Sequence, residues 1–200
     1  MKKFAFAAFL VCFSVSLFAQ DIKLPTPIKT GGAPLMDVLS KRKTEREYTG
    51  AELDKQTLSN LLWAAYGFNR EDKRTVPSSQ NRQEIDVYVV IKNAMYFYDA
   101  KTNLLKLHKK GDFSEALGQP HITSKAALSI VYVANLDKAS NRQAAYTDTG
   151  YISQNVYLFA AANKLGTVAR GSFNRELLPK MIGLTDKQEV TLVQPVGVLK

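Results

Sequence analysis

Residues 77–83 read PSSQNRQ, and residues 85–91, one position further on, read IDVYVVI. The second stretch alternates apolar side chains at a period of two and is rich in β-branched residues, which predicts a strand. A loop of small hydroxyl and amide side chains held by a strand can present hydrogen-bond donors and acceptors to a flat polar ligand. The alternative is an ordinary loop before a strand, since Pro, Ser and Asn are common turn residues. Two other parts of the chain, residues 42–46 and 169–171, favour the ligand-binding interpretation of this loop over an ordinary turn.

The N-terminus has the pattern of a secretory signal peptide. Met1–Lys3 carries two positive charges, residues 4–18 are almost wholly apolar, and Ala19 is a small residue before a plausible cleavage point. The alternative is an uncleaved anchor helix. We therefore predict a signal peptide at residues 1–19 and a periplasmic or secreted bacterial protein, with no membrane attachment once the signal is cleaved.

The rest of the chain suits one globular domain with a basic surface. Of the 200 residues, 46% are hydrophobic and 22% are charged. Loss of Lys2 and Lys3 lowers the net charge from +9 to +7, and loss of Cys12, the only cysteine, excludes disulfides and thiolate metal sites. The cations are interleaved with acids, so the charge favours one anionic small-molecule ligand over a nucleic acid. The two histidines lack metal-ligand spacing, and no metal site is predicted.

The order of the expected elements indicates an α+β fold with an antiparallel or mixed sheet flanked by helices. Residues 20–34 form an extended N-terminal arm, rich in Pro and Gly, that either drapes over the core or spaces it from a membrane. Residues 35–200 form the single domain. Helices are expected at residues 35–39, at 55–66 between a cap at Asp54 and a stop at Gly67, at 151–165 after a cap at Asp148, and at 176–182. Further strands are expected at 95–98, 104–107, 128–134, from Thr167, and at 190–193, with the last ended by Pro195–Gly197.

Three groups of residues are candidates for a binding site. Residues 42–46 read RKTER, and three cations with one hydroxyl in five positions can neutralise a phosphate, although a solvated helix end has the same composition. The loop at 77–83 offers the amides of Asn81 and Gln83 to the edge of a heterocycle. At 169–171 the chain reads ARG, where glycine lets main-chain N–H groups approach a ring.

The order of these segments resembles the FMN-dependent nitroreductase family. Members carry an R-x-S/T-x-R/K segment, a P-S-x-x-N-x-Q segment that leads into a strand, a late strand and turn with a glycine, and often a C-terminal P-V-G segment. The matching stretches here are residues 42–46, 77–83, 168–173 and 195–197, and the stretches at 154–158 and 165–168 are also similar. The resemblance covers about residues 35–200 and is strongest to the branch with the azoline-peptide dehydrogenases and to small exported nitroreductase-like proteins.

The resemblance implies a homodimer with FMN bound at the subunit interface. Arg42, Lys43, Thr44 and Arg46 would hold the phosphate and ribityl end, and Asn81, with Ser78, Ser79 and Gln83, would contact the ribityl chain or the ring edge. The main chain around Arg170 and Gly171 would face the ring, and Lys200 would add a cation at the phosphate. No side chain is expected to act as a catalytic acid, base or nucleophile, because the flavin carries the redox chemistry.

The implied activity is electron transfer from NAD(P)H or another donor, through FMN, to a small nitroaromatic, quinone or similar acceptor. Residues 143–146 read QAAY and lack the Lys-Tyr pair of the azoline-forming branch, which disfavours peptide dehydrogenation. Free NAD(P)H is scarce outside the cytoplasm, so a protein or a quinol is an alternative donor. Two other functions remain open: a catalytically inactive protein that binds flavin or another planar ligand, and a basic structural protein of the cell envelope.

Overall fold

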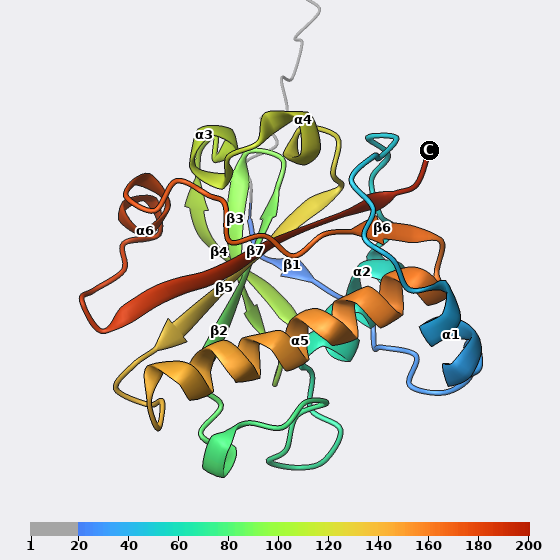
Figure 1. Cartoon of the computed structure of the whole chain (residues 1–200), viewed down its shortest axis with the longest axis horizontal. Coiled ribbons are helices and arrows are strands. Elements are labelled where there is room, and N and C mark those ends of the chain that lie inside the picture. Colours follow the sequence, from blue (N-terminus) through green and yellow to red (C-terminus); the bar gives the residue numbers. More distant parts are fainter. Residues whose placement is uncertain (1–19) are drawn as a thin grey trace, which may run out of the picture.

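The computed structural model describes residues 20–200, and the predicted signal peptide at residues 1–19 lies outside the described residues. One seven-stranded sheet has the order β1-β4-β3-β2-β5-β7-β6, and all neighbouring strands are antiparallel (Figure 1). The predicted α+β fold is confirmed. The strands are β1 (Ile22–Lys23), β2 (Ile85–Ile91), β3 (Ala94–Asp99), β4 (Leu104–Lys110), β5 (Leu128–Asn135), β6 (Leu165–Thr167) and β7 (Gln188–Val198).

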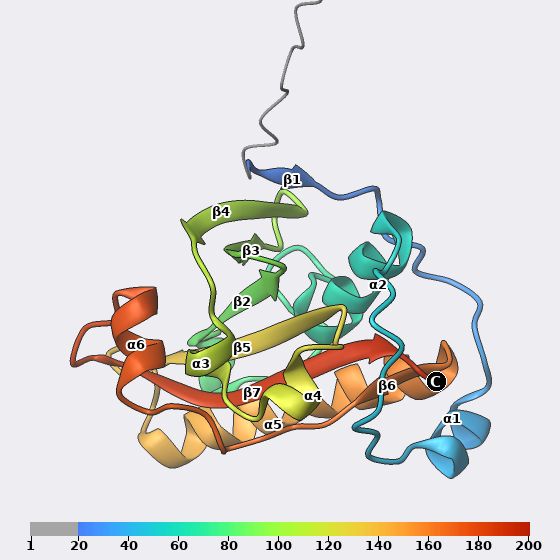
Figure 2. The ribbon, with the colours of Figure 1, turned by 90° about the horizontal axis from the view of Figure 1, so that it is seen from above.

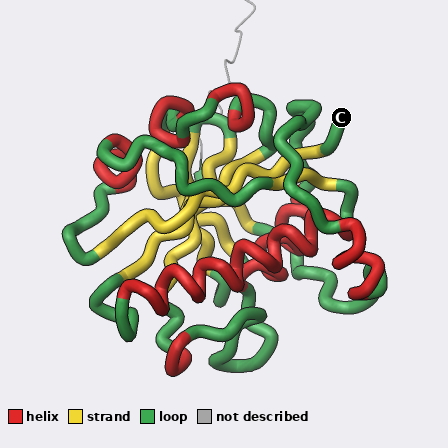
Figure 3. Tube along the Cα trace, in the orientation of Figure 1, coloured by secondary structure: helices red, strands yellow, loops and turns green. Residues whose placement is uncertain are grey.

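Helices cover both faces of this sheet (Figures 2 and 3). The alternation in β2 decides which side chain joins which core, because successive side chains on a strand point to opposite faces. Val87 and Val89 pack in the larger core with α2 and α5, whereas Tyr88 and Val90 pack in the second core with α3 and α6. The helices are α1 (Leu35–Lys41), α2 (Lys55–Tyr66), the 3₁₀ helix η1 (Ser79–Asn81), α3 (Ser114–Leu117), α4 (Pro120–Thr123), α5 (Arg142–Ala162) and α6 (Leu177–Ile182).

The longest helix, α5, begins earlier than the sequence predicts. Asn141 is its cap and accepts the main-chain N–H of Ala144 at 2.8 Å. Asp148, predicted as the cap, lies inside the helix and is buried. The polar stretch before Gly150 can lie inside the helix because its hydroxyls find partners there, as Thr149 does by donating to the carbonyl of Ala145 at 2.8 Å.

The last strand is also longer than predicted, since Pro195–Gly197 does not break it. Pro195 pairs with Ser129 of β5, and its carbonyl accepts the Thr167 hydroxyl at 2.8 Å. Proline has no N–H to donate to a neighbouring strand. This does not weaken the sheet at Pro195, because β6, the neighbour on that side, has already ended at Thr167. β7 therefore runs unbroken from the end of the sheet near α6 to the end near α1 (Figure 1).

The N-terminal arm lies over the core. Its two-residue strand β1 pairs with Leu104 and Leu105 at the outer edge of β4, and Leu24 is buried. The carbonyl of Pro25 accepts the Ser59 hydroxyl at 2.6 Å and the Asn103 amide at 2.7 Å. The arm is thus fastened to both α2 and the turn between β3 and β4.

Candidate functional site

The basic segment at residues 42–46 is fixed against the end of the sheet by Tyr48. This side chain is 1% exposed, and its ring occupies the space left by Gly166 of β6 and Gly197 of β7, which are cross-strand partners. A Cβ added at Gly197 would lie 2.8 Å from Tyr48 Cγ. The Tyr48 hydroxyl donates to the carbonyl of Glu45 at 2.9 Å, and the Glu45 N–H donates to the carbonyl of Thr167 at 3.0 Å. The predicted P-V-G segment therefore has a packing role here.

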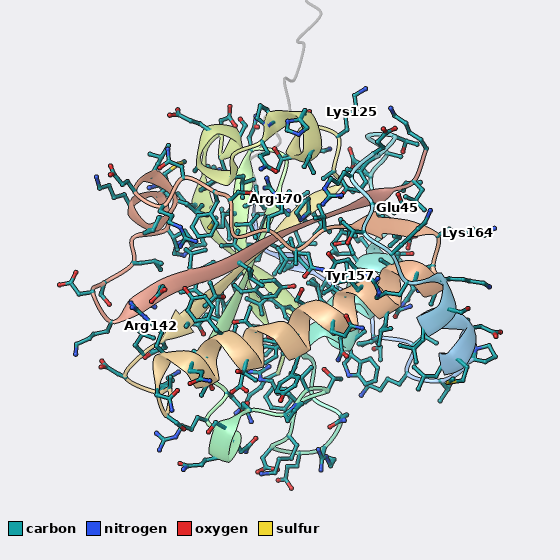
Figure 4. All side chains as sticks on the ribbon, viewed as in Figure 1. Glu45, Lys125, Arg142, Tyr157, Lys164 and Arg170 are labelled. Atoms are coloured by element: carbon teal, nitrogen blue, oxygen red, sulfur yellow. The ribbon has the colours of Figure 1, made fainter. Side chains whose placement is uncertain are left out.

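Tyr157 of α5 joins this segment to the chain that follows β6 (Figure 4). Its hydroxyl accepts the main-chain N–H of Ala169 at 2.9 Å and lies 3.3 Å from the Thr44 hydroxyl. The Arg42 guanidinium lies over its ring, 5.4 Å from the centroid. One side chain therefore holds two of the three predicted site segments together. Tyr157 is not among the predicted site residues, because its partners are 113 residues and 12 residues away in the chain.

The cations of the segment are not equivalent. Within residues 20–200, Arg42 and Arg46 have no carboxylate partner, whereas Lys43 pairs with Glu45 at 2.5 Å. Lys200 is exposed and lies 3.4 Å from Glu47. The two arginines are thus the cations of this segment that remain available to an anion. A cavity of about 210 Å³ lies between the segment and the end of α5, and it adds two cations that sequence analysis did not select, Lys41 and Lys164.

Arg170 does not present its main chain as predicted. Its N–H and its carbonyl both pair with Val193 of β7, at 2.8 and 2.9 Å. The guanidinium is buried and donates to the carbonyls of Leu117 and Gly118 and to the side chain of Gln119. Burial lowers the pKa of this guanidinium. Arg170 is therefore occupied in holding the connection between α3 and α4, and it leaves Gly171 as the first exposed position of the turn.

Gly171 and Ser172 form the exposed turn, and neighbouring side chains fix its shape. The Gln119 side chain accepts from Arg170 at 2.9 Å and donates to the Ser172 hydroxyl at 2.9 Å. The Arg175 guanidinium donates to the carbonyl of Gly171 at 3.1 Å. A Cβ at Gly171 would meet only that guanidinium, at 3.8 Å, so the turn has open space beside it. Gln119 lies 51 residues from Arg170 in the chain, too far for the motif to have indicated it, and Arg175 lies four residues after Gly171, just outside the motif.

The loop at residues 77–83 lies on the other half of α5. The main-chain N–H of Ser79 donates to Asp148 at 2.9 Å, and its hydroxyl lies 2.8 Å from that of Ser140. Asp148 and Tyr157 are nine residues apart on α5, about 14 Å along its axis. Within one chain, the structure brings together residues 42–46 and 165–172 but not residues 77–83 (Figure 1).

The amides predicted to contact a ligand are used inside the loop itself. Gln83 accepts from Arg74 at 3.0 Å and donates to the carbonyl of Asp72 at 2.7 Å and to the Asn81 side chain at 3.1 Å. The Asn81 amide also donates to the carbonyl of Asp72, and the Ser78 hydroxyl accepts the N–H of Gln83. These bonds hold a strained backbone, since Gln80, Asn81 and Gln83 have φ values of 53°, 57° and 49°.

A buried pair of acids lies under this loop. Glu84 is 1% exposed and Asp148 is 4% exposed. Burial, together with the nearby Asp148 carboxyl, raises the pKa of Glu84 to about 7, whereas the nearby Arg82 opposes the shift. Between about pH 4.5 and pH 7, Glu84 of the folded protein therefore holds a proton that the unfolded chain would release.

Residues 20–200 contain neither a metal-binding cluster nor a membrane-spanning helix. No group of three or more His, Asp or Glu side chains is arranged to hold a metal ion there. None of the helices in that part of the chain has the length and apolarity needed to cross a membrane.

Comparison with known proteins places this fold and these segments in a family. A sequence model of the nitroreductase family matches residues 39–198. A curated protein of Methanocaldococcus jannaschii, provisionally named a nitroreductase, is 28% identical over 180 residues, which are 82% of this chain and 90% of that protein. A crystal structure from Ralstonia eutropha JMP134, named in the same provisional way, is 34% identical with a TM-score of 0.83 and covers 91% of this chain and 90% of its own.

A third relative shows the fold at lower identity. A crystal structure from Desulfovibrio desulfuricans, provisionally named a nitroreductase and solved in complex with FMN, is 18% identical with a TM-score of 0.63, and covers 84% of this chain and 87% of its own. The match to residues 39–198 spans most of the domain that contains both halves of the candidate site. The chain belongs to the nitroreductase family.

Proposed function

We propose that this protein is an FMN-dependent oxidoreductase that passes electrons from NAD(P)H or another donor to a nitroaromatic, a quinone or a similar acceptor. The observation that carries the proposal is the junction at Tyr157, which places the unpaired Arg42 beside Thr44 and joins both to the chain that leads into the open turn at Gly171. Membership of the nitroreductase family and the FMN bound in the relative from D. desulfuricans support a flavin as the ligand.

The residues present fit the chemistry of FMN. Guanidinium groups bind phosphate through paired N–H donors, and Arg42 and Arg46 are the cations of the segment without a carboxylate partner within residues 20–200. Thr44 would donate to a phosphate or ribityl oxygen, and the turn at 171–172 would face the ring. When bound, FMN supplies the redox chemistry, and the protein supplies position and a restricted environment. No side chain near Gly171 needs to act as an acid or a base.

We propose that the complete site forms in a homodimer. Two α5 helices that pack antiparallel about a two-fold axis would bring the loop at 77–83 of one copy to the Tyr157 half of the other. The exposed side of α5 suits such a contact, because it carries large apolar and small residues in a stripe. Its exposed members are Tyr146, Gly150 and Tyr151, and its half-buried members are Leu158 and Ala161. Exposed apolar side chains on α1, Leu35 and Met36, extend this surface.

We also propose that the protein works outside the cytoplasm, where a quinol or a redox protein would replace NAD(P)H as the donor. The support for this location is the N-terminal pattern of the sequence. Fractionation of cells that express the full chain would test it, and recovery only with cytoplasmic markers would contradict it.

The function is tested by the colour and chemistry of the purified protein. We expect a yellow protein with a flavin absorption spectrum that dithionite bleaches and a nitroaromatic or quinone restores under anaerobic conditions. Bleaching without reoxidation by any such acceptor would support the alternative of a flavin-binding protein without turnover. A colourless protein that does not take up added FMN would contradict both.

A matched pair of variants tests the phosphate assignment. We expect Arg42→Ala combined with Arg46→Ala to lower FMN affinity by about 100-fold or more, since two charged hydrogen-bonded contacts of about 1.5–3 kcal/mol each are lost. The control is Lys180→Ala on α6, which removes an exposed cation far from the segment. Unchanged FMN binding by the double variant would contradict the assignment.

A further inference from the structure

A second cleft lies on the part of the molecule where the N-terminal arm crosses α2 and the turn between β3 and β4. Its volume is about 520 Å³, which is within the range of small-molecule sites. The arm forms one wall, the end of α2 with the following loop forms the floor, and residues 100–103 form the opposite wall. None of the lining residues belongs to α5, to residues 42–46, to residues 77–83 or to residues 165–172. The cleft is therefore separate from the proposed flavin site.

The walls of this cleft are held by hydrogen bonds, so the cleft is already formed. Asn103 donates its amide to the carbonyl of Pro25 at 2.7 Å, and Gln56 donates to the carbonyl of Thr26 at 3.0 Å. Next to Lys29, the N–H of Ile28 donates to the Asn60 side chain at 2.8 Å. Ligand binding would therefore not include the entropic cost of ordering the arm, because these hydrogen bonds already order it in the free protein.

Aromatic side chains line the interior of the cleft. Trp63, Phe68 and Tyr98 all contribute to it. Trp63 is fixed by its indole N–H, which donates to the carbonyl of Phe68 at 3.1 Å, and Phe68 is held by the guanidinium of Arg74, 4.4 Å from its ring centroid. Oriented aromatic rings favour a flat aromatic ligand that can stack on them.

The rim of the cleft is basic. Lys23, Lys29 and Lys101 line it, and within residues 20–200 none of them has a carboxylate partner. The Lys29 ammonium lies over the Trp63 ring, 5.6 Å from its centroid. Glu71 is the one acid among the lining residues. The cations therefore exceed the acids, and one of them is placed above the surface on which a ring would stack.

We propose that this cleft is a second ligand site, and that it binds a flat aromatic molecule with an acidic substituent such as a carboxylate or a sulfonate. The ring system would stack against Trp63 and Phe68, and the acidic group would pair with Lys29 and Lys101. An aromatic anion meets both features of the cleft, whereas an aliphatic anion would lose the stacking and a neutral aromatic would lose the charge pairing.

The sequence offers a direct reporter for this site, because Trp63 is the only tryptophan of the chain. The probe is anthraquinone-2-sulfonate, titrated into oxidised protein that is saturated with FMN, with no electron donor present. We expect saturable quenching of the tryptophan fluorescence that weakens with added salt. The neutral analogue 2-(hydroxymethyl)anthraquinone should bind several-fold more weakly. Equal binding of the two compounds, or no saturable quenching, would overturn the proposal.

Matched lysine variants locate the charge pairing. We expect Lys29→Gln and Lys101→Gln each to weaken binding of the sulfonate by about three- to tenfold. Lys180→Gln, an exposed lysine on α6, is the control and should leave the affinity unchanged. Affinity that is the same in all three variants would mean that the lysines are only solvated and would overturn the site.

The fluorescence titration tests the second site whether or not the protein binds FMN. If the protein does not bind FMN, the same titration is performed on the protein as purified. If FMN does bind, quenching that disappears as FMN saturates the protein would assign the probe to the flavin site and would overturn a second site. Quenching that is the same with and without FMN supports it.

Discussion

The hydroxyl of Tyr157 accepts the main-chain N–H of Ala169 at 2.9 Å and lies 3.3 Å from the hydroxyl of Thr44. With the first bond accepted, the hydroxyl proton is available to Thr44. A single side chain of α5 therefore sets the spacing between the basic segment and the chain that leads into the turn at Gly171. In the proposed function, that spacing fixes the phosphate end of the flavin relative to its ring.

Tyr157→Phe should lower FMN affinity without unfolding the protein. The substitution removes two hydrogen bonds and keeps the ring under Arg42, so we expect a loss of stability of about 1 kcal/mol and an affinity about tenfold lower. Fluorescence titration with FMN and thermal unfolding measure the two effects. Tyr88→Phe on β2 is the control, since this tyrosine packs in the second core, away from residues 42–46 and from α5. Equal affinity in both variants would show that Tyr157 does not position the site.

Glu84 should make the protein less stable as the pH rises. Its pKa is about 7 in the folded state against an ordinary value of 4.5, so the folded state binds the proton more tightly. The stabilising effect is therefore complete below pH 4.5 and is lost as the pH rises through 7. We expect Glu84→Gln to remove this slope and to raise the free energy of unfolding at pH 8 by about 2 kcal/mol.

Urea unfolding at several pH values checks the prediction. Glu115→Gln on α3 is the control, since this glutamate is exposed and should leave the slope as in the unmodified protein. A Glu84→Gln protein whose stability still falls between pH 5 and pH 7 would assign the pH dependence to other groups.

Gly197→Ala should displace the basic segment from the sheet. The new methyl group would lie 2.8 Å from Tyr48 Cγ, inside contact distance, and the ring is too buried to move freely. We expect a loss of about 2 kcal/mol in the free energy of unfolding, and weaker FMN binding as Tyr48 shifts residues 42–46. Gly171→Ala, with open space around it, should leave the unfolding free energy within about 0.5 kcal/mol. Similar unfolding curves for the two variants would contradict the packing argument.

Charges placed on the exposed side of α5 should separate the proposed dimer. We expect Tyr151→Glu combined with Leu158→Glu to give a monomer in sedimentation experiments, because like charges would be buried against one another in the contact. That monomer should also lose FMN, since the loop at 77–83 of a partner would be missing. Lys180→Glu on α6 controls for the change of charge. A folded monomer that binds FMN as tightly as the unmodified protein would contradict a shared site.

Local pattern was enough to predict most of the fold. The residues of β2 are those of its alternating stretch, and Asp54 caps α2 as its position indicates, by accepting from Gln56 and Thr57. The predictions were wrong where tertiary contacts decide. Asp148 has the chemistry of a helix cap but is buried in α5, where it accepts the N–H of Ser79. Pro195 has the chemistry of a strand breaker but lies where β6 has already ended.

The residue types of the candidate site could be predicted from the sequence, but the bonding partners of those residues could not. The cations at 42–46 are visible in the sequence, but the carboxylate at Glu45 that occupies Lys43 becomes evident only in three dimensions. Arg170 was selected for its neighbour Gly171, and nothing local indicates that both its main chain and its side chain are already bonded. The role of Tyr157 depends on partners in two distant segments, which no local pattern contains.

The shortness of β1 has a consequence for the behaviour of the protein in concentrated solution. β1 pairs only with Leu104 and Leu105, so among the described residues no strand lies beside the remainder of β4. An uncovered strand edge can template pairing between molecules and so start aggregation. Here that stretch carries Lys106, which pairs with Asp99 at 2.6 Å, together with Lys109 and Lys110, and such charged side chains on a strand edge oppose the approach of a second copy. Neutralising these lysines, for instance to promote crystallisation, would remove a barrier to aggregation.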